Sequence, residues 1–136
     1  MAALIGLGVA LAVVAFARIV GFDRERVFYP TVLIVVAHYY LLFAAVGGKA
    51  GELGLQFLLF GLFSTIAVIG FRISRWFVVA GLALHGLFDF AYQFAGADGG
   101  VPDSWPSFCL TFDLAAAAAL AILLINEGRH APGRQL

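Results

Sequence analysis

WFVVAGLALHGLFDFAYQFA, residues 76–95, is the stretch that identifies the class of this protein. Its length matches the ~20 apolar residues that an α-helix needs to cross a ~30 Å hydrocarbon core. Yet His85 and Asp89 lie inside it, four residues apart and therefore on one face of a helix. Ionisable side chains at that depth in a bilayer are costly, so they indicate a functional site.

The composition of the whole chain also predicts an integral membrane protein. Of its 136 residues, 63% are hydrophobic and only 12% are charged, and the mean hydropathy is +1.03. Soluble proteins average about 25% charged residues. The zero net charge gives no support for binding nucleic acid, and a single cysteine excludes an intramolecular disulfide. We therefore predict an all-α, polytopic membrane bundle that forms one domain, residues 1–136, in the cytoplasmic membrane.

Apolar runs and arginines together predict the topology. Five runs are long enough to span the bilayer: residues 2–20, 28–46, 52–71, 76–95 and 108–125. We expect the first run to be a retained span rather than a signal peptide, because no Lys or Arg precedes it. With five spans, every arginine falls on one side of the membrane and Lys49 alone on the other. The positive-inside rule then predicts the N-terminus outside and the C-terminus inside.

Small residues predict where the helices touch, because they allow backbones to approach closely in a membrane. We expect this role for Gly6, Gly8 and Ala10 in the first run and for the alanines at 115–119 in the last.

Polar side chains from several spans are predicted to converge at one depth. With a rise of ~1.5 Å per residue, the deep ionisable groups fall roughly 9–15 Å below the outer surface. These groups are His38, His85, Asp89 and Asp113. We expect an outward-facing pocket, covered by the glycine-rich loop at 96–107 and supported by Gln56, Tyr92 and Cys109.

A divalent metal site is one chemistry that fits such a pocket. Imidazoles and carboxylates are ligands of Zn²⁺ and related ions. His38, His85 and Asp89 are the predicted ligands, and Asp113 or Asp89 is the predicted catalytic carboxylate. Such a site would support metal-assisted hydrolysis of a membrane-borne substrate.

Three other interpretations stay open. His38 and His85 could be axial ligands of a haem, or the Asp and His side chains could relay protons or ions. Alternatively, the polar groups only join helices, with His85 bonded to Asp113 and His38 to Asp89. The protein would then be a non-catalytic accessory or scaffold subunit in a larger membrane complex, or part of a homo-oligomer.

Three segments resemble a known group of proteins: FYPTVLIVVAHYYLLFA at 28–44, HGLFDF at 85–90 and GVPDSWPSFCLTFD at 100–113. They are similar to a group of small uncharacterised bacterial integral membrane proteins. The resemblance implies a bacterial inner-membrane protein, and it implies no activity, cofactor or partner.

Overall fold

The computed structural model describes residues 1–95 and 100–130, and every regular element in these residues is helical. Five α-helices follow one another: α1 (Ala2–Val20), α2 (Phe28–Val46), α3 (Ala50–Arg72), α4 (Trp76–Tyr92) and α5 (Trp105–Arg129). A short 3-10 helix, η1 (Phe22–Arg24), joins α1 to α2. The predicted all-α class is confirmed, and each helix begins and ends within four residues of its predicted run.

Backbone chemistry accounts for the clearest helix boundaries. Gly21 ends α1 with a φ of 89°, and its N–H donates to the carbonyl of Ala17. A left-handed residue of this kind is a common helix terminator that glycine adopts without steric cost. Pro30 lies in the first turn of α2 and Pro106 in the first turn of α5. Proline is tolerated there because the first turn has no partner for its missing N–H.

Four of the five helices, α1, α2, α3 and α5, are long and apolar enough to cross a membrane. The fifth, α4, is apolar but has only 17 residues, or about 26 Å at ~1.5 Å per residue. Many large apolar side chains are exposed on the outside of the bundle, Leu4, Leu58 and Ile122 among them. An exterior of this kind is expected of a protein that contacts lipid.

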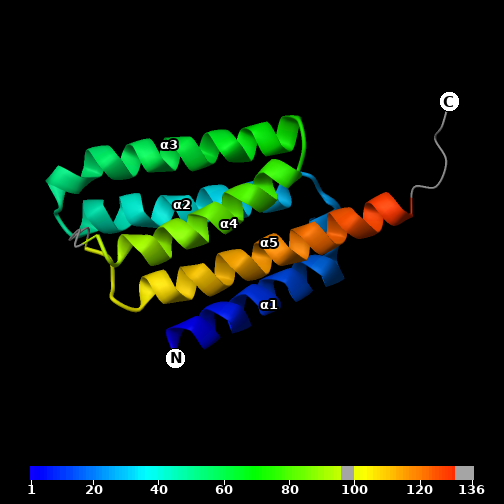
Figure 1. Cartoon of the computed structure of the whole chain (residues 1–136), viewed down its shortest axis with the longest axis horizontal. Helices are drawn as coiled ribbons and strands as arrows, with labels where there is room; N and C mark the ends of the chain where they lie inside the picture. Colours follow the sequence, from blue (N-terminus) through cyan, green and yellow to red (C-terminus); the bar gives the residue numbers. More distant parts are fainter. Residues whose placement is uncertain (96–99, 131–136) are drawn as a thin grey trace.

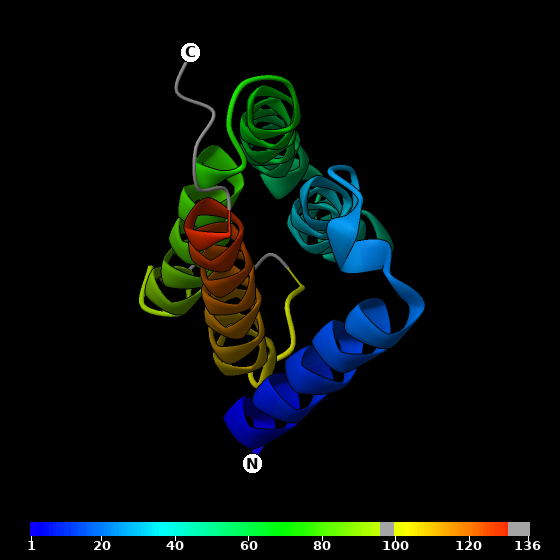
Figure 2. The ribbon, with the colours of Figure 1, turned by 90° about the vertical axis from the view of Figure 1, so that its right-hand side faces the viewer.

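The helices pack as an open ring. In this ring α5 packs between α1 and α4, α4 packs against α3, and α3 packs against α2 (Figures 1 and 2). α1 and α2 are neighbours in the chain, yet their described residues make no helix–helix packing with each other. η1 bridges the two helices at one end. We call the opening between them the α1–α2 seam.

The apolar core lies between α2, α3, α4 and α5. Its most deeply buried side chains include Leu33, Ala67, Val78, Leu82 and Leu120. In this core the side chains of four helices meet, which holds α2 and α3 against the α4–α5 pair.

α1 is attached to α5 at Gly6, which is buried where a side chain would collide with the Phe108 carbonyl. Next to it, the Thr111 hydroxyl donates to the carbonyl of Ala3 at 2.8 Å. The predicted packing role of Gly6 is confirmed, but that of Gly8 is wrong. Gly8 is exposed, and a Cβ added to it would have no neighbour within 4 Å. Gly6 and Gly8 are two residues apart and therefore do not share a helix face.

The alanine run at 115–119 is only partly a packing face. Ala10, Ala116 and Ala117 are buried, as predicted, whereas Ala118 is exposed.

Arginines gather at one end of the bundle. Arg26 donates to the carbonyl of Phe71 at 3.0 Å, which joins the start of α2 to the end of α3. Arg75 pairs with Glu127, which joins the start of α4 to the end of α5. The turn between α2 and α3 lies at the opposite end (Figure 1). Arg134, which the sequence assigns to the arginine side, lies outside the described residues.

Candidate functional site

The candidate site depends on a close approach of α4 and α5 at Gly86. A Cβ built on Gly86 would lie 3.1 Å from the Cβ of Asp113 and 3.3 Å from the carbonyl oxygen of Leu110. The absence of a side chain therefore lets the two backbones come together. His85, the residue before Gly86, is brought beside Asp113 by this contact.

His85, Asp89 and Asp113 form one buried cluster, which we call the His/Asp group. The Nδ1 atom of His85 lies 2.7 Å from Oδ2 of Asp113 and 3.4 Å from Oδ2 of Asp89. One potential ligand atom from each residue lies within 4.8 Å of the other two. The three side chains are at most 2% exposed. The expected convergence of His85 with both aspartates is therefore seen in the structure.

Several oxygen atoms of the His/Asp group have no hydrogen-bond donor. Both carboxylate oxygens of Asp89 and Oδ1 of Asp113 are buried without a hydrogen-bond partner. The hydroxyl of Tyr40 is also buried without one. Tyr40 and Cys109 lie beside the Asp89 carboxyl, but in a geometry that completes no hydrogen bond to it. Buried acceptors without donors are costly, and a cation is one partner that such acceptors bind.

Aromatic rings enclose the group. The ring of Phe63 lies edge-on to the His85 ring, with centroids 4.7 Å apart. The Tyr40 ring lies 6.5 Å from His85 and 5.2 Å from Tyr92 by the same measure. Where the sequence predicts an outward-facing pocket, the structure shows a group that is closed to solvent. Residues 96–99 of the loop expected to cover it lie outside the described residues.

His38 is not part of the group. Its side chain is exposed, and its ring packs on Phe60 at 5.4 Å between centroids. Each residue turns an α-helix by about 100°, so His38 points away from Tyr40, which faces the site. The expected shared site of His38 with His85, the bis-histidine pair for a haem and the pairing with Asp89 are therefore not formed. Periodicity within an apolar helix does not identify the inward face.

The predicted supporting residues divide into two sets. Cys109 is buried beside Asp89 and Asp113, four residues before Asp113 on α5. Gln56 and Tyr92 instead form a second polar layer, in which Nε2 of Gln56 donates to the Tyr92 hydroxyl at 3.0 Å. That hydroxyl donates in turn to Glu52 at 3.4 Å. This layer meets the His/Asp group through the ring of Tyr40.

Tyr40 is the site residue that sequence reasoning does not select. It lies between Tyr39 and Leu41, and Tyr39 is an equal candidate by sequence. The available signal is its spacing from Leu33, Val36 and Ala37, which are all buried on the same face of α2. That signal can be used only after the inward face of α2 is known.

We compared the chain with protein-family models, with curated proteins and with solved structures, and nothing matches. The function must therefore be argued from the site itself. A buried imidazole with two carboxylates, three of whose oxygens lack donors, has the chemistry of a small cation site.

Proposed function

We propose that the His/Asp group holds one divalent metal ion inside the membrane and that this ion supports hydrolysis of a membrane-borne substrate. One observation carries the proposal: three potential ligand atoms from two helices converge in a buried place, where three carboxylate oxygens have no donor. Zn²⁺ is the best match, because it accepts imidazole nitrogen and carboxylate oxygen together.

Two of the ligand spacings can be compared with those around a tetrahedral ion. With bonds of about 2.0–2.1 Å, two ligand atoms of such an ion lie about 3.3 Å apart. The 3.4 Å between His85 Nδ1 and Asp89 Oδ2 already meets this spacing. The 2.7 Å between Nδ1 and Asp113 Oδ2 must open by about 0.6 Å. Metal binding would therefore replace the His85–Asp113 hydrogen bond.

Three protein ligands leave a fourth position for water, which is the arrangement of catalytic zinc sites. The metal would supply an acidified water molecule there. His85 and one oxygen from each aspartate would hold the ion. Oδ1 of Asp89 would then be left to accept a proton from the water. Tyr40 and Phe63 would keep bulk water away from the reacting groups.

The proposal includes a membrane topology. α4 crosses as a fifth span beside the four longer helices, with the N-terminus outside and the C-terminus inside the cytoplasmic membrane. The arginine-rich end of the bundle supports this orientation. We expect alkaline phosphatase, which is active only outside this membrane, to be active when fused at the α2–α3 turn. It should be inactive when fused after α5, and the reverse result would contradict the orientation.

The metal is tested by elemental analysis and zinc titration of the detergent-purified protein. We expect about one metal per chain, as one set of three ligands implies. His85→Ala should lose it, and His38→Ala is the matched control that should keep it. Circular dichroism checks the fold of each variant. No metal in the wild-type protein, or full metal content in His85→Ala, would overturn the assignment.

A second candidate is a non-catalytic accessory or scaffold subunit. It is favoured by the 2.7 Å His85–Asp113 contact, which links α4 and α5 without any ion. In that case the purified protein binds no metal, and His85→Ala mainly loosens the bundle. Co-purification of a fixed membrane partner or a defined homo-oligomer would support this alternative.

A further inference from the structure

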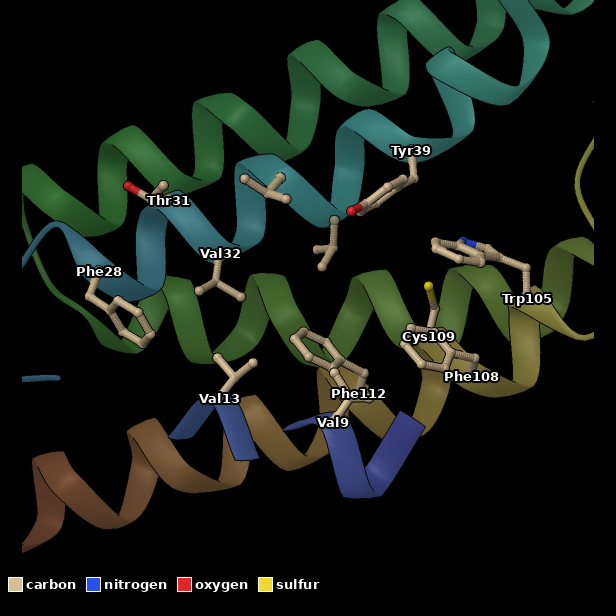
Figure 3. A pocket seen from close by; sticks show the side chains of 12 residues that line it. Val9, Val13, Phe28, Thr31, Val32, Tyr39, Trp105, Phe108, Cys109 and Phe112 are labelled. Carbon is tan, nitrogen blue, oxygen red and sulfur yellow. The ribbon is translucent and has the colours of Figure 1, made fainter. Parts of the chain in front are cut away.

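The α1–α2 seam contains a cavity of about 360 Å³. Its walls come from α1 and α2, which are consecutive in the chain, and from the distant α5, as Figure 3 shows. α1 contributes Val9 and Val13, α2 contributes Val32 and Val36, and α5 contributes Phe108 and Phe112. None of the described side chains that line it is ionised. The occupant must therefore be apolar over most of its length.

The cavity is elongated along α2. Phe28 lies at one end and Tyr39 at the other, with Val32 between them (Figure 3). Eleven residue steps of ~1.5 Å separate Phe28 from Tyr39, which gives about 16 Å. The acyl chains of one bilayer leaflet occupy about half of a ~30 Å hydrocarbon core, or ~15 Å. The length of the cavity therefore matches one lipid chain.

The Tyr39 end of the cavity is its polar end. Trp105 lines it, and the Nε1 donor of Trp105 is buried without an acceptor. The Trp105 ring is held between Tyr39 and Phe43, with centroid distances of 5.0 and 4.9 Å. The Tyr39 hydroxyl also points toward the cavity (Figure 3). A ligand here needs an oxygen acceptor at this end and hydrocarbon along the rest.

Other occupants fit the cavity less well. A second helix of ~10 Å diameter and ~16 Å length needs roughly 1,200 Å³, which exceeds the 870 Å³ of empty space in the cavity. Water is disfavoured, because apolar cavities without several polar partners stay dry.

We propose that the α1–α2 seam binds one acyl chain of a membrane phospholipid, whose ester carbonyl accepts a hydrogen bond from Nε1 of Trp105. This inference does not depend on a metal in the His/Asp group.

Native mass spectrometry of the protein released from phosphatidylethanolamine–phosphatidylglycerol nanodiscs tests the proposal. We expect one retained phospholipid per chain, identified by its mass. Trp105→Phe keeps an aromatic ring and removes the donor, and should weaken retention about fivefold, the effect of one hydrogen bond. Val32→Phe fills the cavity and should weaken it about tenfold or more.

Val68→Phe is the matched control, because Val68 is exposed on α3 away from the seam. It should retain lipid like the wild type. Equal lipid retention by Val32→Phe and Val68→Phe would overturn the proposal. A protein dimer that is disrupted by Val32→Phe but not by Val68→Phe would also overturn it, because a second chain would then occupy the seam. Circular dichroism distinguishes these results from unfolding, and Trp105→Phe supplies the test if Val32→Phe does not fold.

Discussion

The α4–α5 interface and the α1–α2 seam lie on either side of Cys109, and they differ in packing and in polarity. At the α4–α5 interface, Gly86 allows the backbones to approach closely, and the ionisable groups between the helices are fully buried. At the seam, apolar side chains from α1 and α2 face each other across a cavity. Cys109 lines that cavity and also lies beside Asp89.

The contrast follows from the solvent properties of a bilayer. Lipid tails are as apolar as leucine, so apolar helices gain little by excluding lipid from between them. A seam of valines can therefore stay open, with a lipid chain as its filling. Polar groups have no such alternative in hydrocarbon and must be enclosed by protein. Tight packing is expected where the polar groups lie, and the structure shows it there.

Asp113→Ala should have the largest effect on the α4–α5 interface. The substitution removes the 2.7 Å partner of His85 Nδ1 and leaves only Oδ2 of Asp89, at 3.4 Å, beside it. Loss of a buried hydrogen-bond partner costs about 1–3 kcal/mol. We expect this loss in the free energy of unfolding of the metal-free protein, measured in mixed detergent micelles. Leu114→Ala, at the exposed neighbouring position, is the control. Equal stability of the two variants would contradict the interface as described.

Gly86→Val tests the close helix approach. The Cβ of a valine would lie 3.3 Å from the Leu110 carbonyl oxygen and 3.1 Å from the Cβ of Asp113, so α5 must move by a few tenths of an ångström. Overpacking of this kind costs about 1–3 kcal/mol. We expect the lower part of that range, because α5 can shift slightly. Gly61→Val provides the comparison, since a Cβ on Gly61 has no neighbour within 4 Å. If both variants unfold like the wild type, α4 and α5 are farther apart than the structure shows.

Asp89→Asn tests whether the Asp89 carboxylate binds metal or stabilises the packing of the helices. Both Asp89 oxygens lack donors, so the metal-free variant should be as stable as the wild type or up to about 1 kcal/mol more stable. Zinc affinity should nevertheless fall by at least about tenfold. Isothermal titration measures the affinity and micelle unfolding the stability. A clear loss of stability with no change in affinity would assign Asp89 to helix packing.

His38→Ala should have the smallest effect. Its exposed side chain contacts Phe60, and surface substitutions of this kind usually change stability by less than about 0.5 kcal/mol. Metal content should also be unchanged. Loss of metal in this variant, measured by elemental analysis, would restore His38 as a ligand.

Part of the candidate site is predictable because two of its pairs are local. His85 with Asp89, and Cys109 with Asp113, are each separated by four residues. Helical geometry places such residues on one face whatever the helix packs against. His38 and Tyr40 show where this reasoning stops, because they are two residues apart and the sequence does not say which of them faces inward. The structure selects Tyr40.

The sequence by itself determines that this is an all-helical chain with segments long and apolar enough to cross a membrane. It also determines that acidic and histidine side chains lie at mid-helix. These properties depend on composition, run length and local spacing. Only the tertiary structure decides the rotation of each helix, the α4–α5 contact and the open α1–α2 seam. The physical reason is that helices exposed to lipid are apolar on all sides, so hydrophobic periodicity does not distinguish the face toward protein from the face toward the bilayer.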